Sequence, residues 1–478
     1  MAQQNGVVNS FIWKAGERIL VQGVGLLVQV ILARLLLPED FACLAIINAI
    51  IGYLGIFVQS GLSIAVVQKK NLTEEDLKTL TGISLLVALI LFAALYVLSP
   101  FISDYYNVGN ITWPIRVMGV SLFLFSFNSI QSGLLMRRMQ FRTIFMRSLL
   151  ATPLSSIVGI VLAYAGCGIW ALVAYSVTNI LLTVVFMNMI PDLRLKIGFN
   201  RESAKELYSF CLKIIGTNLV SSGGDTIRTL TIGKKYNPNQ LAFFDRGLTY
   251  SSLVTQVVNA SLSSVLLPTF SRSQDDYNQL LSVARRSVGL SAFVIFPLLV
   301  FVAAAAEPLV GLVLTEKWLP CTIFLSVFCL MRIPGIIASI DKQVFYALGK
   351  SQIGLYFEIC LLAANLVSLF VLLSKGPLAI AIGFTIVEYI GNIVLFFVAS
   401  KVYNYSIKKR INDIGLPIIN SLILFAVCYG VYYLHLSYIY TILLQLVLGL
   451  TVYIMFAYCV HDRNLNILKD IILRLCNK

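Results

Sequence analysis

Hydrophobic stretches long enough to cross a membrane recur fourteen times in this chain of 478 residues. The hydrocarbon core of a bilayer is about 30 Å thick, and a helix of about 20 apolar residues spans it. Backbone polar groups in that core must be paired within their own segment, so each stretch is expected to be an α-helix. The expected spans are 11–35, 41–66, 80–100, 113–136, 148–165, 169–190, 209–232, 241–268, 287–313, 319–341, 353–373, 377–400, 414–434 and 438–460. The sequence therefore predicts an all-α integral membrane protein with 14 transmembrane helices.

The composition agrees with this class. Hydrophobic residues make up 58% of the chain and charged residues 12%, whereas a soluble protein carries about 25% charged residues. The loops between the expected spans are short, so no domain outside the membrane is expected. The first ten residues lack the basic segment and the cleavage site of a signal peptide, so we expect no removable leader. Function should then reside in the membrane helices.

The distribution of Lys and Arg predicts an orientation. Loops after the odd-numbered spans hold four of these residues, Lys234, Lys235, Lys317 and Lys375, whereas loops after the even-numbered spans and the two tails hold most of the 36. The positive-inside rule then places both termini in the cytoplasm. The formal charge of +14 is thus read as an orientation signal and not as a nucleic-acid surface, which would need the cations gathered in one patch.

The chain also resembles itself at an offset of 200 residues. Matching positions are Arg34 and Lys234, Pro38 and Pro238, Ala42 and Ala242, Leu62-Ser63 and Leu262-Ser263, and Asp76 and Asp276. Six helices per copy is an even number, so the two copies should run parallel in the membrane. We expect helices 1–6 in residues 1–193, a cytoplasmic linker at 194–206, helices 7–12 in 207–403, and helices 13 and 14 with a cytoplasmic tail in 404–478.

Polar side chains gather on one side of the first helix of each predicted half. A charge in mid-membrane costs about 2.5 to 3.5 kcal/mol on insertion scales, so these side chains should face water or protein, as in the wall of a cavity. Arginine offers two parallel hydrogen bonds to a phosphate and lysine offers a mobile charge. The residues expected to contact a substrate are Lys14, Arg18 and Gln22 of the first span, Lys213, Asn218 and Arg228 of the seventh, and Arg116, Arg246 and Arg332 of the fourth, eighth and tenth spans.

Two other readings of the embedded charges stay open. The cations could pair internally, as Glu17 with Lys14 or Asp245 with Arg246, or extend from helix ends towards the membrane surface. The acids Glu17, Asp225 and Asp245 could hold a coupling ion, either H⁺ or Na⁺, or could serve only as structural partners.

Neither a metal nor a cofactor is expected. The nine cysteines show no Cys-x-x-Cys or Cys/His spacing of the kind that binds zinc. Gly349-Lys350-Ser351 resembles the end of a phosphate-binding P-loop, but Val344 stands where that motif begins with glycine. Direct ATP hydrolysis is therefore not expected, and no catalytic residues are predicted.

Three stretches near the amino terminus resemble a known family. They are Trp13-Lys14-Ala15-Gly16-Glu17-Arg18, Ile31-Leu32-Ala33-Arg34-Leu35-Leu36-Leu37-Pro38-Glu39-Asp40-Phe41 and Gly61-Leu62-Ser63-Ile64-Ala65-Val66-Val67-Gln68-Lys69-Lys70. They are similar to the start of bacterial lipopolysaccharide and O-antigen flippases, the polysaccharide-transport branch of the multidrug/oligosaccharidyl-lipid/polysaccharide (MOP) exporter superfamily. Ala42-Cys43 departs from the pattern, since relatives often have glycine after the phenylalanine.

The resemblance implies two six-helix bundles and two further helices, alternating between inward-open and outward-open states. It implies transport of an undecaprenyl-diphosphate-linked oligosaccharide from the cytoplasmic to the periplasmic leaflet of the bacterial inner membrane. The implied partners are the lipid-linked glycan, the bilayer, a coupling ion, and the polymerase and assembly machinery for the glycan; nucleic acid is not among them. Arg18 and Lys213, one from each half, are the residues expected to hold the diphosphate.

Three rival functions remain open from the sequence. A drug/cation antiporter of the same superfamily would share the fold, but should have fewer embedded cations. A flippase for the peptidoglycan lipid precursor is closer in chemistry. A glycan polymerase or ligase is the enzymatic rival, and it would usually carry a large periplasmic loop, which the short loops here do not provide.

Overall fold

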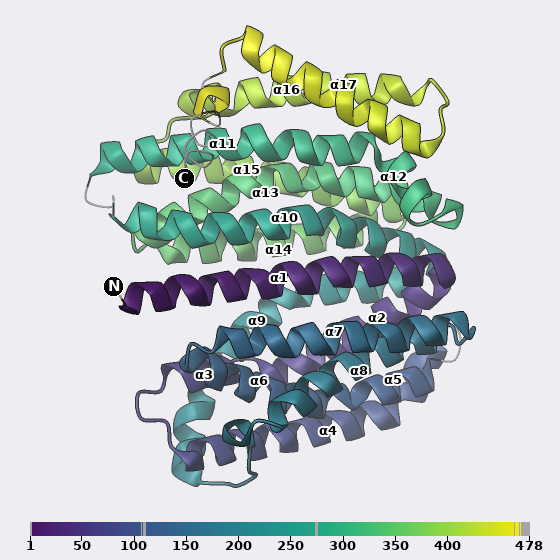
Figure 1. Ribbon diagram of the computed structural model, residues 1–478, viewed down its shortest axis with the longest axis vertical. Helices are drawn as coiled ribbons and strands as arrows, with labels where there is room; N and C mark the ends of the chain where they lie inside the picture. Colours follow the sequence, from purple (N-terminus) through teal and green to yellow (C-terminus); the bar gives the residue numbers. More distant parts are fainter. Residues whose placement is uncertain are drawn as a thin grey trace. The chain divides into compact units, whose positions relative to one another are not determined.

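The computed structural model describes residues 2–106, 108, 111–272, 276–462, 464–467 and 469. The side chains of residues 2–15, 18, 19, 206, 209, 210, 254, 257–265, 267–269 and 272 also lie outside the described residues. Every regular element in the described part is helical, as predicted. The chain divides into two compact units, Met1–Ala242 and Phe243–Lys478, and within each unit long helices run side by side (Figure 1).

Nine α-helices and a short 3₁₀ turn make up most of the first unit in the described residues. They are α1 (Ala2–Leu35), α2 (Pro38–Gln59), α3 (Leu62–Gln68), α4 (Glu74–Tyr106), α5 (Thr112–Gly119), α6 (Ser121–Arg137), α7 (Phe141–Tyr164), α8 (Ile169–Asn188), η1 (Pro191–Leu193) and α9 (Arg201–Lys235). Local sequence explains where several begin. Pro38 opens α2, where a proline costs no hydrogen bond, and the Asn200 side chain accepts the backbone N–H groups of Glu202 and Ser203 to cap α9.

The first unit is held by helix pairs and by one arginine that closes a helix end. Helix α7 packs against α1 and α8, and α9 packs against α2 and α4. The Arg137 guanidinium of α6 donates to the carbonyl oxygens of Val66, Val67 and Lys70, at 2.9, 3.3 and 2.8 Å. These carbonyls lie at the end of α3, where the helix supplies no further donors. Arg137 therefore fixes α3 against α6.

The second unit contains the larger part of α10 and seven further α-helices in the described residues. They are α10 (Pro238–Arg272), which starts in the first unit, α11 (Tyr277–Ala304), α12 (Ala306–Val313), the 3₁₀ helix η2 (Glu316–Cys321), α13 (Thr322–Ala347), α14 (Ser351–Leu372), α15 (Pro377–Tyr403), α16 (Ile407–Tyr432) and α17 (Tyr438–Cys459). Helix α11 packs against α13 and α16, α13 against α15, and α16 against α17. Phe270, Phe296 and Phe345 are among the fully buried side chains of its core.

The helix ends reproduce the predicted offset of 200 residues. Helix α1 ends at Leu35 and α2 begins at Pro38, while α9 ends at Lys235 and α10 begins at Pro238. In both places two residues separate the helices, and a proline stands at the first position of the second helix, where it is favoured. The compact units divide at Ala242, after α9, because α9 packs on α2 and α4. The repeat boundaries inferred from the sequence, with a linker at 194–206, stay a prediction.

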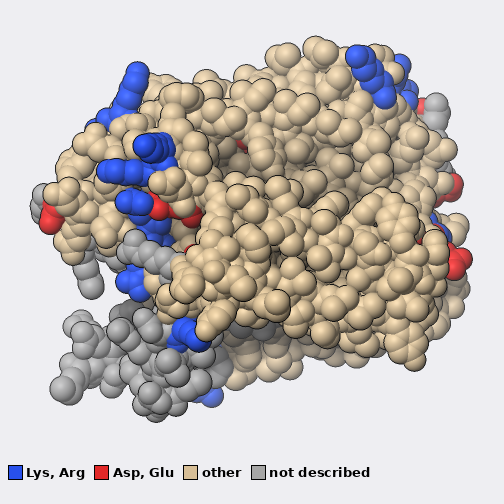
Figure 2. Space-filling view, turned by 90° about the horizontal axis from the view of Figure 1, so that it is seen from above, with Lys and Arg blue, Asp and Glu red and all other residues tan. Residues whose placement is uncertain are grey.

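The helices are built to cross a membrane several times. Eleven segments in the described residues have the length and apolarity of a membrane span; the predicted total of 14 would also need α1, α9 and α10, which are 34 or 35 residues long but more polar. Large apolar side chains such as Leu355, Val367 and Phe370 of α14 are exposed. Figure 2 shows a face that is nearly free of charge, with Lys and Arg gathered at its left end and a smaller number of basic and acidic side chains at its right end. This is a multi-pass membrane protein.

Candidate functional site

Helix α9 carries a row of polar side chains, most of which are exposed. We call Lys213, Thr217, Ser221, Asp225 and Arg228 the α9 stripe; their spacing of three or four residues places them on one face of the helix. Lys213, Thr217, Ser221 and Asp225 are exposed. The hydroxyls of Thr217 and Ser221 donate to the carbonyl oxygens four residues earlier, at 3.1 and 2.9 Å. These hydroxyls therefore need no partner from another helix, and their oxygens still have acceptor capacity for a ligand.

The two charges at the far end of the α9 stripe neutralise each other. Arg228 donates to the Asp225 carboxylate at 2.7 Å, three residues away on the same helix. The Arg228 side chain is 16% exposed and the Asp225 side chain 74% exposed. No ion pair of Lys213 occurs among the described residues, so Lys213 is the uncompensated cation of the stripe there. Asn218 lies beside it and is half-buried.

A second pair of predicted site residues is also joined. On α10, Arg246 donates to the Asp245 carboxylate at 3.1 Å, and Arg246 is buried. The helix approaches α13 closely here, since a Cβ atom on Gly247 would lie 2.6 Å from Cβ of Phe324. Phe244 packs on the rings of Phe324 and Phe328. Arg246 thus pairs with Asp245 inside the protein, which is one of the alternatives that the sequence left open.

Arg116 of α5 contacts side-chain and backbone groups of α4. Its guanidinium lies 4.0 Å from the centre of the Tyr96 ring and 5.0 Å from that of Trp113. Its Nε donates to Ser99 Oγ at 2.9 Å and its Nη2 to the carbonyl oxygen of Tyr96 at 3.3 Å. Stacking on aromatic rings together with hydrogen bonds fits an arginine that joins two helix ends. Arg116 can reach a ligand only with donors that these contacts leave free.

The remaining predicted residues are placed as follows. Gln22 of α1 and Arg332 of α13 are half-buried, and each interacts with other residues of the chain. The side chains of Lys14 and Arg18 lie outside the described residues. Glu17 of α1 is half-buried and accepts a hydrogen bond from Ser148 Oγ at 3.4 Å.

The structure adds one charged residue that the sequence analysis assigned to a loop. Arg147 lies inside α7, where its Nη1 donates to Asn128 Oδ1 at 3.0 Å and to Ser132 Oγ at 3.2 Å, both on α6. It also interacts electrostatically with Glu17 of α1. We call Glu17, Asn128, Ser132, Arg147 and Ser148 the Glu17–Arg147 network. It joins α1, α6 and α7 inside the first unit.

Comparison with known proteins identifies the family. Residues 31–323, more than half of the chain, match the model of a family described as polysaccharide biosynthesis protein. The chain belongs to this family.

Relatives of this polysaccharide biosynthesis protein include an uncharacterized membrane protein in the cps region of Klebsiella pneumoniae, 24% identical over 98% of both chains. The succinoglycan biosynthesis transport protein ExoT of Rhizobium meliloti is 22% identical over 70% of this chain and 67% of its own. Among solved structures, the lipid II flippase MurJ in an inward closed conformation has a TM-score of 0.77 and 17% identity, over 94% of this chain and 99% of its own. Multidrug transporters of the MOP superfamily share the fold.

The predicted family and an all-helical membrane fold like that of MurJ are therefore confirmed. The predicted total of 14 spans stays a prediction. The predicted binding residues of this polysaccharide biosynthesis protein stay a prediction. A sequence signal for Arg147 did exist, because Phe141, Ile144 and Phe145 are apolar and extend the helical period of the following span past Arg147. A charged residue that has apolar residues at helical spacing on both sides indicates a charge inside the helix rather than in a loop.

Proposed function

We propose that this protein is a flippase that moves an undecaprenyl-diphosphate-linked oligosaccharide, a repeat unit of O-antigen, capsule or exopolysaccharide, from the cytoplasmic to the periplasmic leaflet by alternating access. The observation that carries the proposal is the exposed α9 stripe with Lys213, in a chain of a polysaccharide biosynthesis family. A membrane helix exposes such a row at a cost unless it meets water or a polar ligand. A diphosphate supplies the anion, and a glycan supplies hydroxyl groups for the polar side chains.

The names of similar proteins support transport rather than synthesis. ExoT is named a biosynthesis transport protein, and the solved structure with the same fold is that of a lipid II flippase. In the proposed arrangement Lys213 and Arg18, from repeat-related helices α9 and α1, hold the diphosphate. Arg228 and Arg246 are weaker candidates, since each is bound to a neighbouring aspartate. Lys14, Gln22, Arg116, Asn218 and Arg332 complete the proposed lining.

The test replaces both residues proposed to hold the diphosphate. Arg18→Ala with Lys213→Ala should abolish surface-glycan export while the amount of protein in the membrane stays normal. Lys205→Ala is the matched control, because Lys205 is an exposed lysine of α9 outside the stripe. Full export by the double variant would refute the assignment. Loss of viability instead of loss of surface glycan, on deletion of the gene, would favour a peptidoglycan-precursor flippase, and a change in drug resistance alone would favour an antiporter.

We further propose fourteen spans with both termini in the cytoplasm of the inner membrane. The eleven apolar segments of the described residues make fourteen spans when α1, α9 and α10 are added. The polar rows of these three helices would face the transport path. The few basic residues after odd-numbered spans support the orientation. A membrane-impermeant thiol reagent should label a single cysteine placed at Lys375 from the periplasmic side. A single cysteine placed at Lys350 should be labelled only after the membrane is permeabilised. The reverse pattern would exclude this topology.

We propose that Glu17, rather than Asp225 or Asp245, is the main residue that couples transport to H⁺ or Na⁺. The two aspartates are each bound by an arginine three residues or one residue away, which favours a structural role. Glu17 is bound by a hydroxyl and interacts electrostatically with Arg147 across helices. A carboxylate shared between helices can change partners when the helices move, and a protonated or ion-bound Glu17 would weaken its attraction to Arg147.

A further inference from the structure

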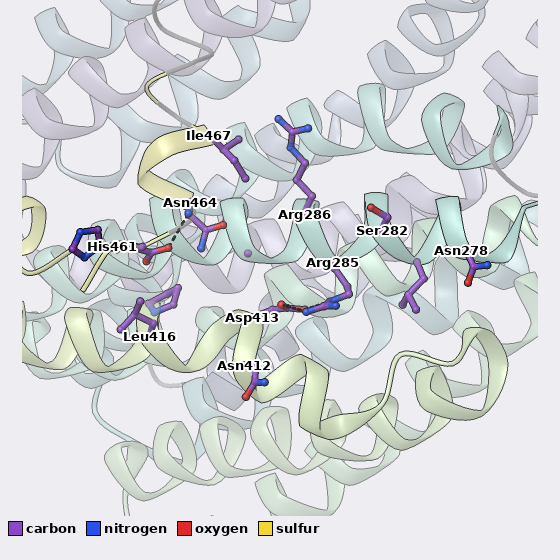
Figure 3. A pocket seen from close by; sticks show the side chains of 14 residues that line it. Asn278, Ser282, Arg285, Arg286, Asn412, Asp413, Leu416, His461, Asn464 and Ile467 are labelled. Carbon is purple, nitrogen blue, oxygen red and sulfur yellow. Dashed lines mark hydrogen bonds and ion pairs between the residues drawn. The ribbon is translucent and has the colours of Figure 1, made fainter. Parts of the chain in front are cut away.

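A polar cavity lies in the second unit. Its volume is about 440 Å³, within the usual range for small-molecule sites. The wall comes from the first turns of α11 and α16 and from the residues that follow α17 (Figure 3). Two helices begin and one ends there, so the cavity lies at one end of three membrane spans. In a membrane crossed by these three spans, the cavity would lie near the surface, among the lipid headgroups.

One pair of charges in the wall is already satisfied. Arg285 of α11 and Asp413 of α16 form two hydrogen bonds, both 2.7 Å long, and Figure 3 shows the two side chains facing each other. The Tyr405 hydroxyl donates a further bond to Asp413 at 2.8 Å. This pair joins α11 to α16 and leaves little charge for a ligand.

Two other charges in the wall form no ion pair among the described residues. Arg286 of α11 is exposed and lines the cavity, and no ion pair of Arg286 occurs among the described residues. Asp462, after α17, is 4% exposed. Its Oδ1 accepts the backbone N–H of Asn464 at 2.8 Å, but its Oδ2 receives no hydrogen bond within the described part of the chain. A buried carboxylate oxygen without a donor is costly, so a donor from outside the chain is favoured.

The turn that carries Asp462 is packed firmly on α11. Asn464 lies against Gly289, where a Cβ atom would come within 2.8 Å of Asn464 Oδ1. Besides the Arg285–Asp413 pair, the cavity thus holds one cation and one buried anion, with the amides of Asn278 and Asn412 and the apolar side chains of Leu416 and Ile467 around them. A ligand that matches this wall carries both a negative and a positive group.

We propose that this cavity binds the headgroup of a phospholipid with a primary ammonium group, the phosphate at Arg286 and the ammonium at Asp462. A primary ammonium has three N–H donors, one of which would satisfy Asp462 Oδ2. A choline headgroup has no N–H to donate, and a glycerol headgroup has no positive charge. Phosphatidylethanolamine therefore fits, and its glycerol end would lie beside Leu416 and Ile467.

The experiment measures which lipids the full-length protein retains. Protein in nanodiscs of equal parts phosphatidylethanolamine, phosphatidylcholine and phosphatidylglycerol is released and its bound lipids are counted by native mass spectrometry. The wild type should retain phosphatidylethanolamine over phosphatidylcholine by about tenfold or more, the worth of one hydrogen bond to a charged group. Asp462→Asn should remove this preference. Arg286→Gln should lower the retention of both lipids, and Lys401→Gln, which removes an exposed cation outside the cavity, should change neither.

Several results would overturn the proposal. These are equal retention of the two lipids by the wild type, an unchanged preference in Asp462→Asn, or selection of phosphatidylglycerol. If Asp462→Asn does not fold, unchanged retention by Arg286→Gln overturns it instead. Soluble glycerophosphoethanolamine is added as a competitor, and binding of this compound without retention of the lipid would assign the cavity to a soluble ligand. Lipid retention does not depend on glycan export, so failure here is separate from failure of the proposed function.

Discussion

The Arg410 guanidinium donates hydrogen bonds of 2.7 and 3.0 Å to the two carboxylate oxygens of Asp341, and both side chains are fully buried. The Tyr403 hydroxyl donates to Asp341 Oδ1 at 2.5 Å, and Arg410 also lies 4.2 Å from the centre of the Tyr405 ring. The pair joins the end of α13 to the start of α16. Two such charges can remain buried because their mutual attraction and hydrogen bonds offset the hydration that each lost on leaving water.

We expect Asp341→Asn to lower the free energy of unfolding by about 3 to 5 kcal/mol, because it leaves the Arg410 charge buried without its partner. The measurement is the fraction of monodisperse protein after heating, by size-exclusion chromatography in detergent. Replacing both residues, Asp341→Leu with Arg410→Met, should be less destabilising than the single change. Lys401→Ala, at an exposed position, is the control. A single variant as heat-stable as the wild type would contradict the prediction.

We expect Gly82→Ala to loosen the segment between η1 and α9. A Cβ atom at Gly82 would clash with the Gly198 carbonyl oxygen. At this point the segment docks on α4 through the hydrogen bond from Gly198 N–H to the Lys78 carbonyl oxygen at 3.2 Å. Overpacking against backbone costs about 1 to 3 kcal/mol, more than the helix gains from alanine, about 1 kcal/mol.

Trypsin cleavage after Arg194 and Lys196 reports this loosening, and it should speed up roughly 5- to 30-fold if 1 to 2 kcal/mol is lost. Gly52→Ala is the matched control, because nothing lies within 4 Å of a Cβ atom there. Equal cleavage rates in both variants would show that the segment does not need the small residue.

We expect Glu17→Gln to uncouple export from the ion gradient without unfolding the protein. Glutamine keeps an oxygen for the Ser148 hydroxyl but loses the charge that interacts with Arg147. A coupling free energy of about 1 to 3 kcal/mol corresponds to a change of about 5- to 150-fold. The measurement is transport in proteoliposomes with an imposed H⁺ or Na⁺ gradient. Ser148→Ala, which removes only the 3.4 Å hydrogen bond, should keep the gradient response; a response equal to wild type in Glu17→Gln would exclude Glu17 as the coupling residue.

Local features of the chain could be predicted because their causes are local. The break between α1 and α2, and its copy between α9 and α10, follow from Pro38 and Pro238. The partners of charged residues could not be predicted in the same way. Arg285 pairs with Asp413, 128 residues away in the sequence, and Arg410 pairs with Asp341, 69 residues away. Residue spacing within one helix does not predict such pairs between helices.

The sequence by itself determined that this is a helical membrane protein with a helix break at Pro38 that recurs at Pro238, because span length, apolarity and proline positions act within one segment at a time. Only the tertiary structure decided which of the embedded charges are cancelled. Arg228 and Arg246 are bound to adjacent acids, Arg147 lies in a helix among polar groups of α6, and Lys213 is exposed. The reason is that the cost of a charge in a membrane depends on what lies within a few ångströms of it, and packing between helices sets those neighbours.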